Sequence, residues 1–128
     1  MTEKKRILVV DDEPDFCSIV QGNLEKEGFV VEVAYDGDEG LAKVKANPPD
    51  AIVLDVMMPE KDGYAVCREI KSDPEYKDIS VVLLTAVGEA VPSTNYTHMD
   101  GKTSMADDFI AKPIDMDELM EIIAQDIG

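Results

Sequence analysis

Short runs of aliphatic residues recur along the chain with little polar alternation inside them. Strands that are buried on both faces of a parallel sheet read in this way, whereas strands with one solvated face alternate between apolar and polar residues. Five such runs predict five buried strands, at Ile7 to Val10, Val30 to Ala34, Ala51 to Leu54, Val81 to Leu84 and Phe109 to Ala111.

The segments between these runs carry apolar residues at helical spacing. Pro14 suits the opening turn of a helix, and Asp115 is followed three residues later by Glu118, a pattern resembling a capping box. Four helices are predicted, beginning near Pro14, Gly37, Gly63 and Asp115. Because strand and helix alternate, the pattern predicts a doubly wound α/β sandwich that forms one domain over residues 1–128.

The stretch between Leu84 and Phe109 does not show the helical spacing of apolar residues that the other connecting segments show. Pro92, Asn95 and Gly101 interrupt any apolar stripe with a helical period. A fourth crossover helix, counted in chain order, is therefore expected to be irregular or shortened.

Composition excludes several classes of function. The 128 residues are 45 % hydrophobic, enough for one core, and 28 acidic against 12 basic residues give a formal net charge of −16. Direct binding to nucleic acid or to an anionic membrane would begin with repulsion.

The two cysteines, Cys17 and Cys67, are interpreted as buried reduced thiols. With too few apolar residues after the basic N-terminus for a signal peptide, we expect a cytoplasmic protein.

Carboxylates end two of the predicted strands. Asp11 and Asp12 follow the first strand, and Asp55 follows the third. Ligands of open parallel sheets bind at the carboxyl ends of the strands. If these strands are neighbours, each like-charged pair at about 4 Å costs about 4 kcal/mol at an effective dielectric of about 20. An all-oxygen ligand set without nearby Cys or His suits a hard cation, so the sequence predicts a Mg²⁺ site, with Mn²⁺ as an alternative ion.

Helix capping is the other explanation for the first two acids. A carboxylate before a helix can accept hydrogen bonds from its first turn and interacts favourably with the helix dipole. This explanation accounts for Asp11 or Asp12 taken alone and leaves Asp55 unexplained.

Two more predicted strands end in a hydroxyl and an ammonium. Thr85 closes the fourth strand and Lys112 the fifth. Each has an ordinary interpretation by itself, as a cap or as a solvated surface cation. At the same edge as three acids and a cation, they suit an anion with several oxygens, such as a phosphoryl group.

Four stretches, VVDDEP, VLDVMMPEKDGY, LLTA and AKPI, resemble in this order the signatures of the response regulator receiver family. The resemblance covers essentially the whole chain, and four ordered motifs are more specific than one. It implies a flavodoxin-like sheet of five parallel strands in the order 2-1-3-4-5, flanked by helices. It also implies a phosphorelay protein that receives its phosphoryl group from a sensor histidine kinase or a phosphotransfer protein.

The resemblance also implies roles for the acids. Asp55 matches the phosphoacceptor, Asp12 and Asp55 match carboxylate ligands of the metal, and Asp11 matches the acid that orders water around the ion. The backbone carbonyl of Met57 matches the remaining protein ligand.

The other matched residues contact the phosphoryl group or respond to it. Thr85 and Lys112 match the hydroxyl and the ammonium that contact its oxygens, and Phe109 matches an aromatic switch position. Pro113 matches a proline whose preceding peptide bond is usually cis in the family. If Thr85 moves toward the phosphoryl group, Phe109 can turn inward and change the surface that a partner meets.

For partners, the resemblance implies a downstream protein or a fused output domain, and a phosphorylation-dependent dimer is one arrangement to test. The chain is expected to promote its own phosphorylation and dephosphorylation rather than to turn over an external substrate. The long stretch between Thr85 and Lys112 replaces the regular fourth helix, which leaves the geometry of the partner contact open.

Two rival functions would use part of the same residue set. A phosphatase of the haloacid dehalogenase type also uses an aspartate nucleophile and Mg²⁺, but it places a second acid two residues later, where this chain has Met57. The other rival is a pseudo-receiver, a binding module that works without phosphorylation. The presence of Asp55, Thr85 and Lys112 argues against that module.

Overall fold

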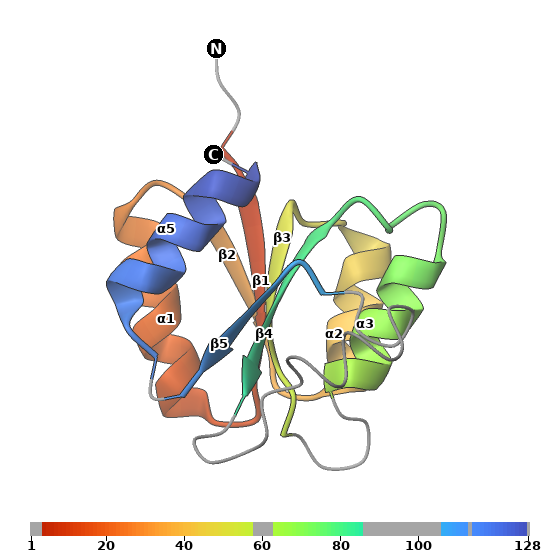
Figure 1. Cartoon of the computed structure of the whole chain (residues 1–128), viewed down its shortest axis with the longest axis horizontal. Coiled ribbons are helices and arrows are strands. Elements are labelled where there is room, and N and C mark those ends of the chain that lie inside the picture. Colours follow the sequence, from red (N-terminus) through yellow and green to blue (C-terminus); the bar gives the residue numbers. More distant parts are fainter. Residues whose placement is uncertain (1–3, 58–62, 86–105, 113, 128) are drawn as a thin grey trace.

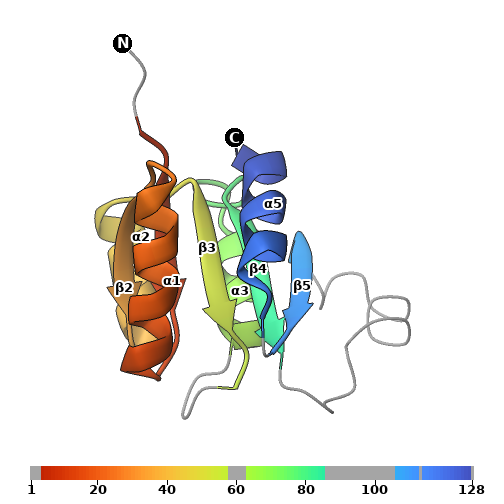
Figure 2. The same ribbon diagram turned by 90° about the vertical axis from the view of Figure 1, so that its left-hand side faces the viewer.

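The computed structural model describes residues 4–57, 63–85, 106–112 and 114–127. Within them, five parallel strands form one sheet in the order β2-β1-β3-β4-β5. Helices α1 and α5 cover one face of the sheet, and α2 and α3 cover the other (Figures 1 and 2). This arrangement confirms the predicted doubly wound sandwich and the implied strand order.

The strands lie where the aliphatic runs predicted them and extend slightly further. They are β1 (Arg6–Val10), β2 (Val30–Ala34), β3 (Ala51–Asp55), β4 (Ser80–Thr85) and β5 (Asp108–Ala111). The residues added at strand starts, such as Arg6 and Ser80, are polar and only half-buried. An aliphatic run marks the buried part of a strand, whereas the hydrogen-bonded ladder continues beyond it.

Local sequence signals explain where the helices begin. The bounds are α1 (Pro14–Lys26), α2 (Gly37–Ala46), α3 (Gly63–Ser72) and α5 (Met116–Ile127). Pro14 occupies the first turn of α1, where its missing N–H costs no hydrogen bond. Asp36 caps α2 by accepting from the Glu39 N–H at 2.7 Å, and Asp115 accepts from the Asp117 N–H at 2.9 Å before α5. The predicted irregular fourth helix falls on residues 86–105, outside the described part of the chain.

Each face of the sheet carries its own apolar cluster. Leu8, Ile52 and Ile70 belong to the cluster under α2 and α3. The cluster under α1 and α5 includes Val9, Val53, Leu24 and Ile123. Alternate strand residues feed opposite faces, which is why the strand sequences are apolar throughout. Cys17 and Cys67 are buried in separate clusters as free thiols, as predicted.

One lysine fixes the start of β5. The Lys71 Nζ donates to the carbonyls of Lys77 at 3.1 Å and Ile79 at 2.7 Å, and to the Asp107 carboxylate at 2.9 Å. The same Asp107 oxygen accepts from the Val81 N–H at 2.8 Å. These bonds tie α3 and the start of β4 to the residue before β5, and so determine where the far end of β5 lies.

Two glycines in helices are expected to respond oppositely to alanine. Gly22 is exposed within α1, and a Cβ there meets nothing within 4 Å. Gly22→Ala should therefore raise the free energy of unfolding by about 0.5–1 kcal/mol, because alanine loses less backbone entropy in a helix. A Cβ on Gly63 would clash with the Asp55 carbonyl and lie 2.8 Å from the Val56 Cα, so Gly63→Ala should lower it. Urea denaturation measures both values, and a Gly63→Ala protein as stable as the parent would contradict the close approach of α3 to β3.

Candidate functional site

The candidate site lies at the carboxyl edge of the sheet, where the strand arrows end in Figures 1 and 2. Strand β1 pairs with β3, so the acids that follow β1 stand beside the acid that ends β3. Strand β4 pairs with both β3 and β5, which brings the ends of these strands to the same edge. A cavity of about 320 Å³ opens there, lined by Asp12, Glu13, Asp55, Met57 and Lys112.

Three carboxylates converge at this edge, as the sequence predicted. Asp11, Asp12 and Asp55 each present an oxygen, and these atoms all lie within 4.8 Å of one another. Asp11 and Asp55 are buried, whereas Asp12 is exposed. Oxygens bound to one Mg²⁺ at about 2.1 Å lie at most about 4.2 Å apart, so this cluster can hold such an ion after a small adjustment.

Burial makes ionised Asp55 unfavourable. Its side chain is almost fully enclosed, and this desolvation raises the pKa of the carboxyl. The Met57 N–H donates to Oδ1 at 3.1 Å and acts in the opposite direction, as does the charge of Lys112. Repulsion from Asp11 and Asp12 adds to the rise, so the net pKa lies above the ordinary value. A cation placed among the three acids would reverse that balance.

Lys112 supplies a cation to the cluster. Its Nζ lies 2.9 Å from Asp11 Oδ2, 3.6 Å from Asp55 Oδ2 and 3.8 Å from Glu13 Oε1. Burial works against the ammonium, but the hydrogen bond to Asp11 and the charges of Asp55, Asp11 and Glu13 outweigh it and raise the pKa of Lys112. The Lys112 ammonium thus makes its strongest contact with Asp11. The negative charge of the Asp55 carboxylate is therefore only partly compensated.

Thr85 ends β4 with a buried hydroxyl. The side chain is 1 % exposed, and its Oγ1 has no hydrogen-bond partner among the described residues. The Thr85 carbonyl accepts from the Lys112 N–H at 2.7 Å, which joins the ends of β4 and β5. A buried hydroxyl left without a partner costs about 1–3 kcal/mol, so this position is suited to a ligand oxygen.

The capping explanation for the first two acids does not hold as far as hydrogen bonds to the first turn of α1 are concerned. The N-cap residue of α1 is Glu13, and its side chain makes no capping hydrogen bond. Asp11 Oδ1 accepts from the Glu13 N–H at 2.9 Å, one residue before the helix, while Oδ2 faces Lys112. Asp12 lines the cavity instead of capping the helix.

The remaining predicted residues lie close to the acids or further along the sheet. Met57 lines the cavity with an exposed side chain. Phe109 is half-buried and packs against the apolar cluster under α2 and α3. Pro113 lies outside the described residues. The roles of Met57 as a metal ligand and of Phe109 as a switch remain predictions.

Some residues of the site were missed by the sequence reasoning. Glu13 lines the cavity and approaches Lys112, and Gly63 allows α3 to begin against the backbone of Asp55 and Val56. Phe16 places its ring 4.6 Å from the Lys112 Nζ. The available signal was that Glu13 directly follows the paired acids and that Phe16 lies in the first turn of the next helix, because residues that open a helix at a strand end face the same crevice.

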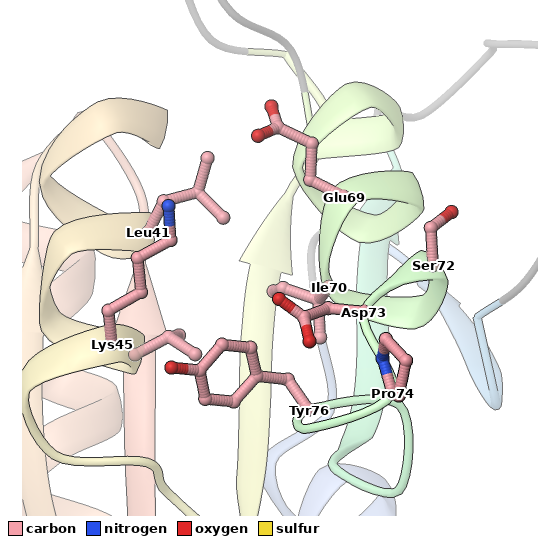
Figure 3. A pocket seen from close by; sticks show the side chains of 9 residues that line it. Leu41, Lys45, Glu69, Ile70, Ser72, Asp73, Pro74 and Tyr76 are labelled. Atoms are coloured by element: carbon pink, nitrogen blue, oxygen red, sulfur yellow. The ribbon is translucent and has the colours of Figure 1, made fainter.

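A second pocket, of about 410 Å³, lies between α2 and α3 (Figure 3). Leu41, Ile70 and Tyr76 provide apolar lining, with Lys45 on the α2 side and Asp73 on the α3 side. Tyr76 belongs to the connection that leads into the start of β4, so this pocket is separate from the acidic cavity at the strand ends. None of the predicted site residues lines it.

Comparison with known proteins agrees with this geometry. Residues 7–124 match the family model described as the response regulator receiver domain. The chain is 39 % identical over 115 residues to the DNA-binding dual master transcriptional regulator RpaA of Synechocystis, covering 90 % of this chain and 46 % of that protein. It is 43 % identical over 110 residues to the response regulator PleD of Caulobacter vibrioides, covering 86 % and 23 % respectively. The chain therefore spans less than half the length of these curated relatives.

Solved structures show the same architecture. A CheY-like response regulator receiver domain protein from Methanospirillum hungatei superposes with a TM-score of 0.84 at 27 % identity, covering 98 % of this chain and 94 % of the other. TrrA of Thermotoga maritima, crystallised in complex with Mg(2+)-BeF, superposes with a TM-score of 0.78 at 33 % identity, covering 95 % and 98 %. Every helix within the described residues is too short or too polar to span a lipid bilayer.

Because the pKa of Asp55 is raised, replacing Asp55 by a neutral residue should increase the free energy of unfolding by an amount that depends on pH. An acid whose pKa is higher in the folded state stabilises the fold fully only below its unfolded pKa, and this contribution disappears as the pH rises through the folded value. Relative to the parent, Asp55→Asn should therefore become more stabilising without divalent ions as the pH rises from 3.8, the ordinary pKa of an aspartate, to about 8, as measured by urea denaturation. Asp78→Asn, at an exposed position, controls for the relief of general negative charge. A difference from the control that stays constant across this pH range would be inconsistent with a raised pKa.

Proposed function

Because the chain belongs to the response regulator receiver domain family, we propose that Asp55 accepts a phosphoryl group and that the aspartyl phosphate changes the surface read by a partner. The convergence of Asp11, Asp12, Asp55 and Lys112 at one edge of the sheet supports this function.

The observation that carries the proposal is the buried hydroxyl of Thr85, which has no hydrogen-bond partner among the described residues. A metal site alone requires the carboxylates but gives no reason to bury a hydroxyl without a hydrogen bond at the end of the neighbouring strand. A phosphoryl group on Asp55 brings strong acceptor oxygens to this edge, one of which can accept from Thr85. The hydroxyl then gains a hydrogen bond that no described residue provides.

A divalent ion fits the acidic side of the same site. Asp11, Asp12, Asp55 and the Met57 carbonyl would hold Mg²⁺, and all four offer oxygen, the ligand this ion prefers. When bound, the ion supplies positive charge that offsets the charge of the phosphoryl oxygens. The complex of Thermotoga maritima TrrA with Mg(2+)-BeF supports this assignment.

The side chains of this chain divide the chemistry among them. A carboxylate oxygen of Asp55 donates an electron pair to phosphorus and forms the new P–O bond, while the bond to the donor breaks and the leaving group keeps its electron pair. The attack requires ionised Asp55, which the charge of Lys112 favours from 3.6 Å. The Lys112 ammonium and the Thr85 hydroxyl then contact the transferred oxygens.

The proposed conformational change follows from the charge and the hydrogen-bond acceptors of the phosphoryl group on Asp55. Phosphorylation adds about two negative charges at pH 7, and Thr85 gains a partner by moving toward them. That movement frees space next to Phe109, which is only half-buried on the neighbouring strand. Phosphorylation shifts the balance between two conformations to the extent that it favours one of them.

The partners follow from the family. We propose a sensor histidine kinase or phosphotransfer protein as the donor, and a downstream protein or fused output domain as the reader, with a phosphorylation-dependent dimer as one form of output. Curated relatives that include RpaA and PleD are longer than this chain, which supports an output function outside the receiver fold. In this reading the protein is cytoplasmic and is not a turnover enzyme.

Incubation with acetyl phosphate and Mg²⁺ separates the three candidate functions. We expect one acid-labile phosphoryl group per chain, detected by intact mass and lost in Asp55→Asn. Asp55 is the buried acid that lines the cavity, whereas Asp11, which is also buried, already bonds to Lys112 at 2.9 Å. Asp78→Asn serves as the matched control and should label like the parent.

Other outcomes would support the rival functions. Continuous hydrolysis of the donor with multiple turnovers would favour a phosphatase, although the position of its second acid is occupied here by Met57. Absence of any label in a folded, Mg²⁺-loaded protein would favour a binding module and contradict the proposal.

A further inference from the structure

An aromatic ring contacts the cation of the site. The Nζ of Lys112 lies 4.6 Å from the centroid of the Phe16 ring, within the range of a cation–π interaction. Phe16 sits in the first turn of α1 and packs against the apolar cluster under α1 and α5. Its ring is therefore held by the core on one side while it meets the ammonium on the other.

The carboxylates near Lys112 are less suited than the Phe16 ring to hold its ammonium in one place. Asp11 and Asp55, at 2.9 and 3.6 Å, are the acids whose oxygens the divalent ion and the phosphoryl group would engage. Glu13 lies further away, at 3.8 Å, and its side chain is 68 % exposed, so its attraction is weakened by solvent. The Phe16 ring offers no oxygen to a hard cation, and it stays available to Lys112 when the carboxylates are engaged elsewhere.

We propose that Phe16 is a positioning residue, whose ring holds the Lys112 ammonium over the acidic cavity so that it meets the phosphoryl oxygens on arrival. The inference rests on the proposed function of the site and deepens it. Four methylene groups carry the Lys112 ammonium, and an unrestrained chain of this length would lose conformational entropy when it binds the phosphoryl group. A ring that restricts it beforehand lowers that loss.

A purely structural role for Phe16 makes different predictions. If the ring only covers the methylene chain of Lys112, leucine should replace it, because leucine is also apolar and bulky. If the negative face of the ring attracts the ammonium, leucine should fail and tyrosine should succeed, since tyrosine retains the ring. A cation–π contact of about 0.5–1 kcal/mol corresponds to about a two- to fivefold change in a rate constant.

The test compares the parent with Phe16→Leu and Phe16→Tyr. At saturating acetyl phosphate and Mg²⁺, Phe16→Leu should lower the rate constant for labelling of Asp55 about two- to fivefold, and Phe16→Tyr should restore it. Ile19→Leu, at an exposed position on the same helix, is the matched control and should label like the parent. Thermal unfolding of each protein establishes that the variants are folded at the assay temperature.

A second readout is independent of phosphorylation. In NMR spectra without a phosphodonor, with and without Mg²⁺, the ε-methylene protons of Lys112 should be shifted upfield by the ring in the parent and in Phe16→Tyr. Phe16→Leu should lose this shift in both conditions. Loss of the shift in Mg²⁺-loaded parent protein would overturn the inference, because the ring would then not hold the ammonium when the acids are engaged.

The outcomes separate this inference from the proposed function. Failure of the parent to be labelled would contradict the function itself. Labelling of the parent at a rate that Phe16→Leu matches, or equal slowing in Phe16→Leu and Phe16→Tyr, would overturn the role of Phe16 while leaving the function intact.

Discussion

Three negative charges held together at the end of a parallel sheet are the constraint on which the rest of the site depends. Strand β1 pairs with β3, so the acids that follow one strand stand beside the acid that ends the other. Burial of Asp11 and Asp55 strengthens their repulsion because little water screens it. Lys112 bonds chiefly to Asp11, so the negative charge of the Asp55 carboxylate is only partly compensated. The receiver fold therefore concentrates negative charge at the residue where phosphoryl chemistry is proposed.

Residues away from the cavity maintain this arrangement. Gly63 lets α3 begin against the backbone of Asp55 and Val56, where a larger residue would displace the strand end. Lys71 and Asp107 fix the start of β5, and the pairing of Thr85 with Ala111 fixes its end beside β4. Lys112 follows directly, so the position of the ammonium depends on contacts at both ends of this short strand. Such positioning by rigid elements is what preorganised charge requires.

The fold and the central residues of the site could be predicted because both follow from the backbone pattern. Aliphatic runs locate buried strands, and acids directly after them must meet if the strands are neighbours. The strand order itself was implied by the family resemblance, not by the runs. The partner of Lys112 could not be predicted, since the choice between Asp11 and Asp55 depends on rotamers and on distances of about an ångström. The contact between Phe16 and Lys112 could not be predicted either, because apolar periodicity indicates burial and not the contact of a ring with a charge. The predicted irregular helix and Pro113 fall outside the described residues and stay predictions.

Thermal unfolding of the parent and of Asp12→Asn, each in EDTA and in increasing Mg²⁺, tests the central claim most directly. Asp12 is exposed, so its neutralisation removes charge from the cluster without opening the core. If mutual repulsion dominates the site, the midpoint of the parent rises with Mg²⁺ and saturates, while Asp12→Asn is more stable than the parent in EDTA and responds less to the ion. Two results together would contradict the account. The unfolding midpoint of the parent would not change with Mg²⁺, and the midpoint of Asp12→Asn in EDTA would be no higher than that of the parent.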